Sequence, residues 1–104
     1  MSETARVRAL HNYHILDTDP DTVFQPIVNT AAIAFDVPIA LVSLVDDERQ
    51  WFKARHGLEA CETAREVSFC SHAIRQDEPF IIPDAQRDPR FSANPLVTGA
   101  PTIR

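Results

Sequence analysis

Pro38-Ile39-Ala40-Leu41-Val42-Ser43-Leu44-Val45 is the segment of this 104-residue chain that decides its fold. It is apolar at nearly every position, which predicts a β-strand with both faces covered. The acidic run Asp46-Asp47-Glu48 after it predicts a turn. The next segment, Arg49-Gln50-Trp51-Phe52-Lys53-Ala54-Arg55, alternates and predicts a second strand that completes a hairpin.

The two faces of this second strand differ in character. Alternation puts Phe52 and Ala54 on one face, and Trp51, Lys53 and Arg55 on the other. Because the second face is basic, the sequence predicts that the strand lies at an edge or turns this face to solvent.

Two helices are expected before the hairpin. Residues 3–14 have the pattern of a short amphipathic helix, and residues 21–35 repeat apolar side chains at helical spacing. Asp19 or Asp21 is the expected cap of the second helix, because a carboxylate there accepts backbone N–H bonds. Pro26 lacks an N–H, so it predicts either a kink or a separate short turn before it.

The second half of the chain is expected to contain shorter elements. Residues 57–65 form a predicted polar loop, and Ser68 is a good cap for a short helix that Gln76-Asp77-Glu78-Pro79 ends. The remaining expected elements are a strand at 79–83, a helical turn around 95–97 and the start of a strand at 102–104.

Composition narrows the classes of function. The chain suffices for one domain, and its net charge of -5 argues against a general nucleic-acid surface. No apolar run approaches the roughly 20 residues that span a bilayer, and residues 1–6 lack the build of a signal peptide. Gly57 and Gly99 are the only glycines, which excludes a glycine-rich phosphate loop. We therefore expect a cytoplasmic domain without membrane contact, in which Cys61 and Cys70 stay reduced.

The segment Ser68-Phe69-Cys70-Ser71-His72 places a thiol and an imidazole two residues apart. On a helix, Cys70 and His72 point roughly 200° apart, so they neither chelate one metal nor form a thiolate–imidazolium pair. A metal site would also need a second cluster of ligands. The favoured interpretation is packing, or the wall of a small-molecule pocket, for Cys70, and a structural role for His72.

Asp84, Asp88 and Arg90 form a second polar group in a proline-rich region. Two carboxylates and a guanidinium could bind a polar ligand. The favoured interpretation is that both aspartates accept backbone N–H bonds in turns, and that Arg90 pairs with one of them.

Several short motifs follow one another in a specific order. They are Tyr13-His14-Ile15-Leu16-Asp17-Thr18, residues 38–46, residues 49–54, Gly57-Leu58, Glu62-Thr63, residues 68–74, Asp84-Ala85, Asp88-Pro89-Arg90-Phe91 and residues 94–99. Together they resemble the GAF domain family, in the subgroup at the front of bacterial sensor histidine kinases and diguanylate cyclases. The resemblance covers nearly the whole chain. It implies an α+β fold, with a PAS-like antiparallel sheet flanked by helices, and a sensory role in bacterial signal transduction without catalysis by the domain.

The resemblance also implies a pocket between the sheet and the helices and loops of residues 70–97. The ligand-binding residues that it predicts on this chain are Phe69, Cys70, His72, Asp84, Phe91 and Leu96. It identifies neither a ligand nor a cofactor, since no motif singles out cyclic-nucleotide or tetrapyrrole binding.

A complete domain of this family would continue past Arg104 with further strands and a last helix. We therefore expect residues 1–104 to be a single GAF-like domain, incomplete at its C-terminus, with an apolar edge at residues 38–45. Such a chain is either a fragment of a signalling protein or a short domain completed by homodimerisation. Two alternatives stay open: a ligand-free dimerisation module, and a free methionine sulfoxide reductase-like enzyme that uses Cys61 and Cys70.

Overall fold

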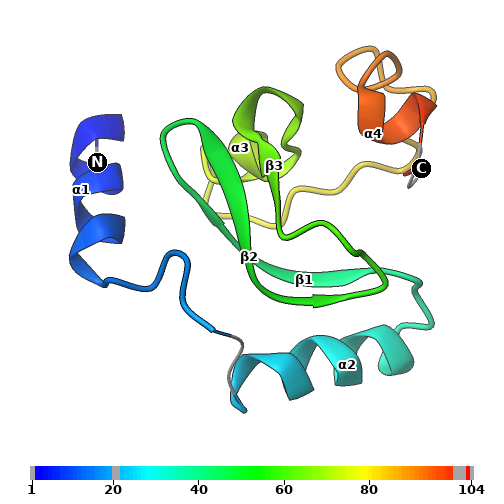
Figure 1. Ribbon diagram of the computed structural model, residues 1–104. Coiled ribbons are helices and arrows are strands. Elements are labelled where there is room, and N and C mark those ends of the chain that lie inside the picture. Colours follow the sequence, from blue (N-terminus) through cyan, green and yellow to red (C-terminus); the bar gives the residue numbers. More distant parts are fainter. Residues whose placement is uncertain (1, 20–21, 100–102, 104) are drawn as a thin grey trace.

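The computed structural model describes residues 2–19, 22–99 and 103. The chain has the predicted α+β fold, with a three-stranded antiparallel sheet and helices around it (Figure 1). The helices are α1 (Glu3–Asn12), α2 (Phe24–Ala34), α3 (Cys70–Ala73) and α4 (Pro95–Thr98), with a 3-10 helix at Arg65–Val67. The strands, in sheet order, are β1 (Ala40–Val45), β2 (Arg49–His56) and β3 (Glu62–Ala64).

The predicted hairpin is confirmed, and it contains a β-bulge. β1 and β2 are antiparallel neighbours, and Val42 pairs with Ala54. The next residue of β1, Ser43, pairs with Phe52, so Lys53 is the extra residue on β2. A bulge re-aims nearby side chains, and a strictly alternating pattern therefore does not describe β2.

β2 is the central strand of the sheet, so the prediction that it lies at an edge is wrong. The three-residue β3, within the segment predicted as a loop, pairs with its second side. Lys53 is only 7% exposed, and its ammonium donates to Thr18 Oγ1 at 2.7 Å and to the carbonyl of Asp19 at 2.6 Å. These oxygens replace water around the buried charge.

β1 is less covered than its apolar sequence predicts. Only Val45 is buried, whereas residues 40–44 are half-buried. Within the described part of the chain β1 pairs with β2 alone, so one edge is open. A groove of about 540 Å³ beside it, between α1 and α3, has apolar walls that include Tyr13, Leu44 and Ile74.

α2 begins later than predicted. Its first residue is Phe24, so Pro26 falls in the first turn, where a missing N–H removes no helical hydrogen bond and no kink is needed. The N-cap is Val23, without a side-chain hydrogen bond, rather than Asp19. Asp21, the other predicted cap, lies outside the described residues.

The two sides of α2 differ in exposure. Val28 and Ala32 are buried, and the helix packs against β1 and β2. Ile27, Ile33 and the adjoining Phe35 are exposed, Ile33 and Phe35 to 79% and 77%. Despite these apolar residues, no helix in the described part of the chain is long and apolar enough to cross a membrane.

None of the residues of α1 is buried, and polar contacts join this helix to the sheet. Glu3 pairs with Arg65 of the 3-10 helix and with Arg6, which donates to a carbonyl at the end of β1. These two guanidinium groups lower the pKa of Glu3 to about 2. His11 Nε2 lies 2.7 Å from Asp46 Oδ1. Burial opposes ionisation of Asp46, but this contact contributes to keeping its pKa below the ordinary value.

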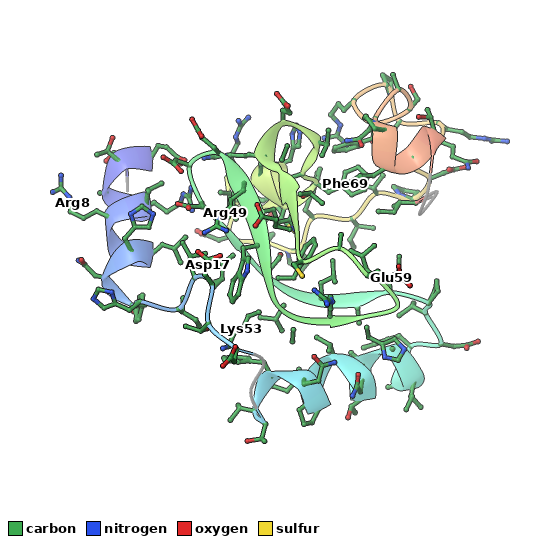
Figure 2. The ribbon with its side chains drawn as sticks, viewed as in Figure 1. Arg8, Asp17, Arg49, Lys53, Glu59 and Phe69 are labelled. Atoms are coloured by element: carbon green, nitrogen blue, oxygen red, sulfur yellow. The ribbon has the colours of Figure 1, made fainter. Side chains whose placement is uncertain are left out.

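The segment after α1 is fixed to β2 by an ion pair. Arg49 donates to the two carboxylate oxygens of Asp17 at 2.8 and 2.7 Å (Figure 2). This hydrogen bonding holds the pKa of Asp17 below its ordinary value. Asp17 has a φ of 62°, a left-handed conformation that aspartate tolerates better than most residues, and the chain turns there toward α2.

The C-terminal half packs around a small core of Ala85, Phe91 and Val97. The predicted strand at 79–83 is wrong, because this proline-bounded segment is irregular and instead packs apolar side chains on that core. The predicted helical turn is confirmed as α4. Of the predicted strand at 102–104 only Ile103 lies among the described residues, and it is not in a strand.

Candidate functional site

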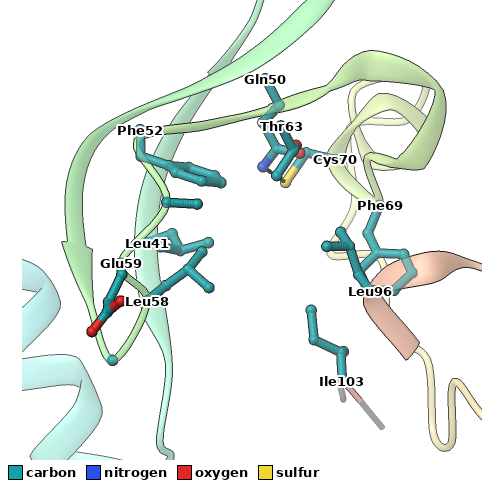
Figure 3. Close-up of a pocket in the computed structure, with 12 residues that line it drawn as sticks. Leu41, Gln50, Phe52, Leu58, Glu59, Thr63, Phe69, Cys70, Leu96 and Ile103 are labelled. Atoms are coloured by element: carbon teal, nitrogen blue, oxygen red, sulfur yellow. Dashed lines mark hydrogen bonds between the residues drawn. The ribbon is translucent and has the colours of Figure 1, made fainter. Parts of the chain in front are cut away.

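A cavity of about 540 Å³ lies between the sheet and the α3 and α4 regions (Figure 3). Its volume falls within the range of small-molecule sites in proteins. Most of its walls are apolar, and the large side chains that form them are Leu41, Phe52, Leu58, Phe69, Leu96 and Ile103.

Polar groups gather at one end of this cavity, where Gln50, Thr63 and Cys70 lie together (Figure 3). Gln50 and Thr63 are cross-strand partners on β2 and β3. Gln50 Nε2 donates to Cys70 Sγ at 3.1 Å, and its carbonyl oxygen accepts from the hydroxyl of Ser68. Ser43 Oγ on β1 lies 3.3 Å from the same sulfur. The polar end is therefore anchored to all three strands and to α3.

Ser68 positions α3 at this end of the cavity. Its hydroxyl oxygen accepts a hydrogen bond from the N–H of Ser71 at 3.2 Å, as predicted for a helix cap. The same hydroxyl donates to Gln50. One buried side chain thus fixes both the start of α3 and the amide that faces the cavity.

The predicted divergence of Cys70 and His72 is observed in their contacts. Cys70 turns toward the sheet and its polar partners, as described above. His72 stacks on Phe80 with ring centroids 6.2 Å apart and meets Phe91 edge-on at 5.0 Å. Phe69 contacts the same Phe91 ring at 4.6 Å. The rings of His72, Phe80 and Phe91 form an aromatic group behind the cavity. This group supports Phe69, which faces the cavity.

The six residues predicted to bind a ligand fall into two groups. Phe69, Cys70 and Leu96 line the cavity. The described lining does not include His72, Phe91 or Asp84. His72 and Phe91 belong instead to the aromatic group behind it.

Asp84 and Asp88 form turns, as the favoured interpretation has it. Asp84 Oδ1 accepts from the N–H of Gln86 at 3.0 Å, and Asp88 Oδ1 accepts from the N–H of Arg90 at 2.9 Å. The Arg90 side chain also donates to both oxygens of Asp88 and lowers the pKa of this carboxyl to about 2. The hydrogen bonds of both carboxylates are thus made within their own turns, and they shape the loop.

Residues on the strands complete the site, and sequence reasoning missed them. Leu41, Gln50, Phe52 and Thr63 line the cavity from β1, β2 and β3. Gln50 gave a weak signal, because a glutamine on a central strand needs buried hydrogen-bond partners, but its neighbour Arg49 and the other basic residues of the segment favoured an edge. β3 gave almost no signal, since it is only three residues long.

Metal binding and chemistry that uses two cysteines each require side chains that lie close together. Among residues 2–19, 22–99 and 103, no group of three or more histidine, cysteine or acidic side chains is placed to hold a metal ion. The two cysteines are free and line different pockets. Cys61 is exposed and accepts from Arg55 Nη1 at 2.8 Å, whereas Cys70 contacts Ser43 and Gln50.

The chain matches a family model and a curated relative. The model of the GAF domain family matches residues 19–104. A cyclic di-GMP phosphodiesterase of Pseudomonas aeruginosa is 42% identical over 102 residues, or 98% of this chain. The chain spans 17% of the length of that relative.

Proposed function

The chain belongs to the GAF domain family, and from this premise we propose that it is a regulatory domain of a signalling protein that senses a small molecule. The observation that carries the proposal is the cavity of about 540 Å³ with apolar walls and one polar end. Such a combination fixes the orientation of a small ligand and excludes water from it.

The similarity to a cyclic di-GMP phosphodiesterase supports a role in signalling. That similarity concerns 17% of the relative, so catalysis is not attributed to this domain. We infer that the domain regulates an output that other parts of its protein supply. A phosphodiesterase output accords with this relative, whereas the histidine kinase and diguanylate cyclase of the sequence resemblance stay predictions.

The test is native mass spectrometry of the full-length protein purified from its host. We expect an added mass that is lost in the Ala60→Trp variant, because Ala60 lines the cavity at an exposed position and an indole there would narrow its opening. The matched control is Ala34→Trp on the exposed side of α2, which should retain the added mass. An added mass that survives Ala60→Trp would place the ligand elsewhere and contradict the proposal.

A second proposal is homodimerisation, favoured by the open edge of β1 and the apolar groove beside it. A second copy could pair with this edge and cover the groove. The double variant Tyr13→Lys/Ile74→Lys would charge the groove, whereas Ile33→Lys charges the outer face of α2. Light scattering should show weaker dimerisation for the double variant alone. A monomer at micromolar concentration in the unmodified chain would refute this proposal.

A further inference from the structure

The polar end of the cavity contains a group that lacks a partner. Thr63 Oγ1 is buried and has no hydrogen-bond partner among the described residues. A buried hydroxyl without a partner is unfavourable, so a ligand that bonds to it gains free energy. The neighbouring Gln50 amide has two N–H groups, of which one contacts Cys70. Gln50 and Thr63 are therefore the side chains of this end that a hydrogen-bonding ligand group would engage.

The sides of the cavity suit a ring. Phe52 and Phe69 lie on opposite sides of it, and Leu41, Leu58 and Leu96 complete the apolar surface (Figure 3). Aromatic and branched aliphatic walls bind flat apolar rings through burial and ring packing.

The described lining of the cavity carries one ionised side chain, a carboxylate. Within the described lining the ionised side chain is Glu59, which is exposed at the rim. A phosphate or carboxylate entering here would lose water and meet this carboxylate, whereas anions are usually bound by arginine, lysine or a set of backbone N–H groups.

We propose, on the basis of the proposed function, that the cavity binds an uncharged, mainly apolar ring compound with one hydrogen-bonding group at the Gln50–Thr63 end. A nucleotide anion does not match this lining. The ring occupies the space between Phe52 and Phe69. The hydroxyl of Thr63 is closed off in the free chain, so the Thr63 side chain rotates about χ1 to bring this hydroxyl to the hydrogen-bonding group of the ligand.

The test compares two probes that differ in charge on the same ring system. Indole-3-acetamide is uncharged at pH 7, whereas indole-3-acetate is an anion, and cyclic GMP serves as a nucleotide probe. Each is titrated into the isotopically labelled chain, and backbone amide shifts in a nuclear magnetic resonance spectrum report the site. We expect indole-3-acetamide to change the backbone amide shifts of cavity residues such as Leu58, Thr63 and Leu96. It should bind at least ~10-fold more tightly than either anion, a difference of about 1.4 kcal/mol.

Variants connect the binding to the named atoms. Thr63→Val keeps the shape of the side chain but removes the hydroxyl, and should weaken indole-3-acetamide about 2- to 10-fold, the value of one hydrogen bond. Thr30→Val, at an exposed position of α2, is the matched control and should leave the affinity unchanged.

The outcomes separate this inference from the proposed function. Equal or tighter binding of indole-3-acetate or cyclic GMP at the cavity would overturn the ligand class and leave a small-molecule role intact. Unchanged affinity in Thr63→Val would overturn the role of the hydroxyl. If no probe shifts the cavity amides and Ala60→Trp does not alter the added mass of the native protein, the cavity is not a binding site and both proposals fail.

Discussion

Gln50 Nε2 donates a hydrogen bond to Cys70 Sγ at 3.1 Å, and so the central strand is joined to α3 across the polar end of the cavity. Gln50 is 5% exposed, and its carbonyl oxygen accepts from Ser68, the residue that caps α3. A single buried amide thus connects the sheet, the start of a helix and a thiol. The geometry of the candidate site depends on this connection, because buried polar groups fix the arrangement of the elements that satisfy them.

Replacing this amide should destabilise the fold. In Gln50→Leu the shape is roughly kept, but the hydroxyl of Ser68 and the thiol of Cys70 each lose a partner. We expect a loss of about 1–3 kcal/mol in the free energy of unfolding, measured by urea denaturation. The control Gln76→Leu, at an exposed position after α3, should stay within about 0.5 kcal/mol. Equal effects of the two substitutions would contradict the connecting role of Gln50.

Phe91 should be the most sensitive aromatic residue. It is 2% exposed and contacts the rings of Phe69, His72 and Phe80. Phe91→Ala leaves a void at the centre of this group and should cost about 3–5 kcal/mol. Phe35→Ala removes the same ring from a position that is 77% exposed and should cost less than about 0.5 kcal/mol. Urea denaturation followed by circular dichroism measures both.

Loss of Phe91 should also reach the cavity, because Phe69 packs against it with ring centroids 4.6 Å apart. Binding of indole-3-acetamide to folded Phe91→Ala protein should be weaker than to the unmodified chain. Unchanged binding would show that Phe69 holds its place without this support.

The sequence predicted the parts of the fold that have long or strongly patterned signals. The hairpin, the existence of the helix predicted at 21–35 and observed at Phe24–Ala34, and capping by Ser68 were predicted from local rules. The position of Lys53 was not, because burial of its charge depends on oxygens of residues 18 and 19, which are distant in sequence. Likewise, the cavity wall depends on the cross-strand register of β2 and β3, which no local pattern in residues 57–65 reveals.

Acid should weaken the attachment of α1. Glu3 has a pKa of about 2 in the folded chain against an ordinary value of 4.5, because it contacts Arg6 and Arg65. A lowered folded-state pKa contributes stability above the ordinary pKa, and this contribution is lost as pH falls from about 4.5 toward about 2. The lowered pKa of Asp46 acts in the same direction.

The measurement is the urea midpoint between pH 7 and pH 2 for the unmodified chain and for Glu3→Gln. The variant should be less stable at pH 7, and the two curves should approach each other toward pH 2, as Glu3 becomes protonated. Glu66→Gln, at an exposed position of the 3-10 helix, serves as the control and should follow the unmodified chain. A constant offset between Glu3→Gln and the unmodified chain at all pH values would refute the ionic origin.

The two thiols should differ in reactivity, and this difference tests both the site and the enzymatic alternative. Cys61 is exposed, whereas Cys70 is partly buried and contacts Ser43 and Gln50. In the single variants Cys61→Ser and Cys70→Ala, the remaining thiol is labelled with a mild disulfide reagent. Cys70 should react at least ~10-fold more slowly than Cys61, since about 1.4 kcal/mol of local opening reduces the accessible population tenfold.

Indole-3-acetamide should slow the labelling of Cys70 further and leave that of Cys61 unchanged, because of the two thiols only Cys70 lines the cavity. Rapid formation of a Cys61–Cys70 disulfide in the unmodified chain would contradict the separate placement of the thiols and favour a reductase, whose chemistry needs two cysteines within reach of each other.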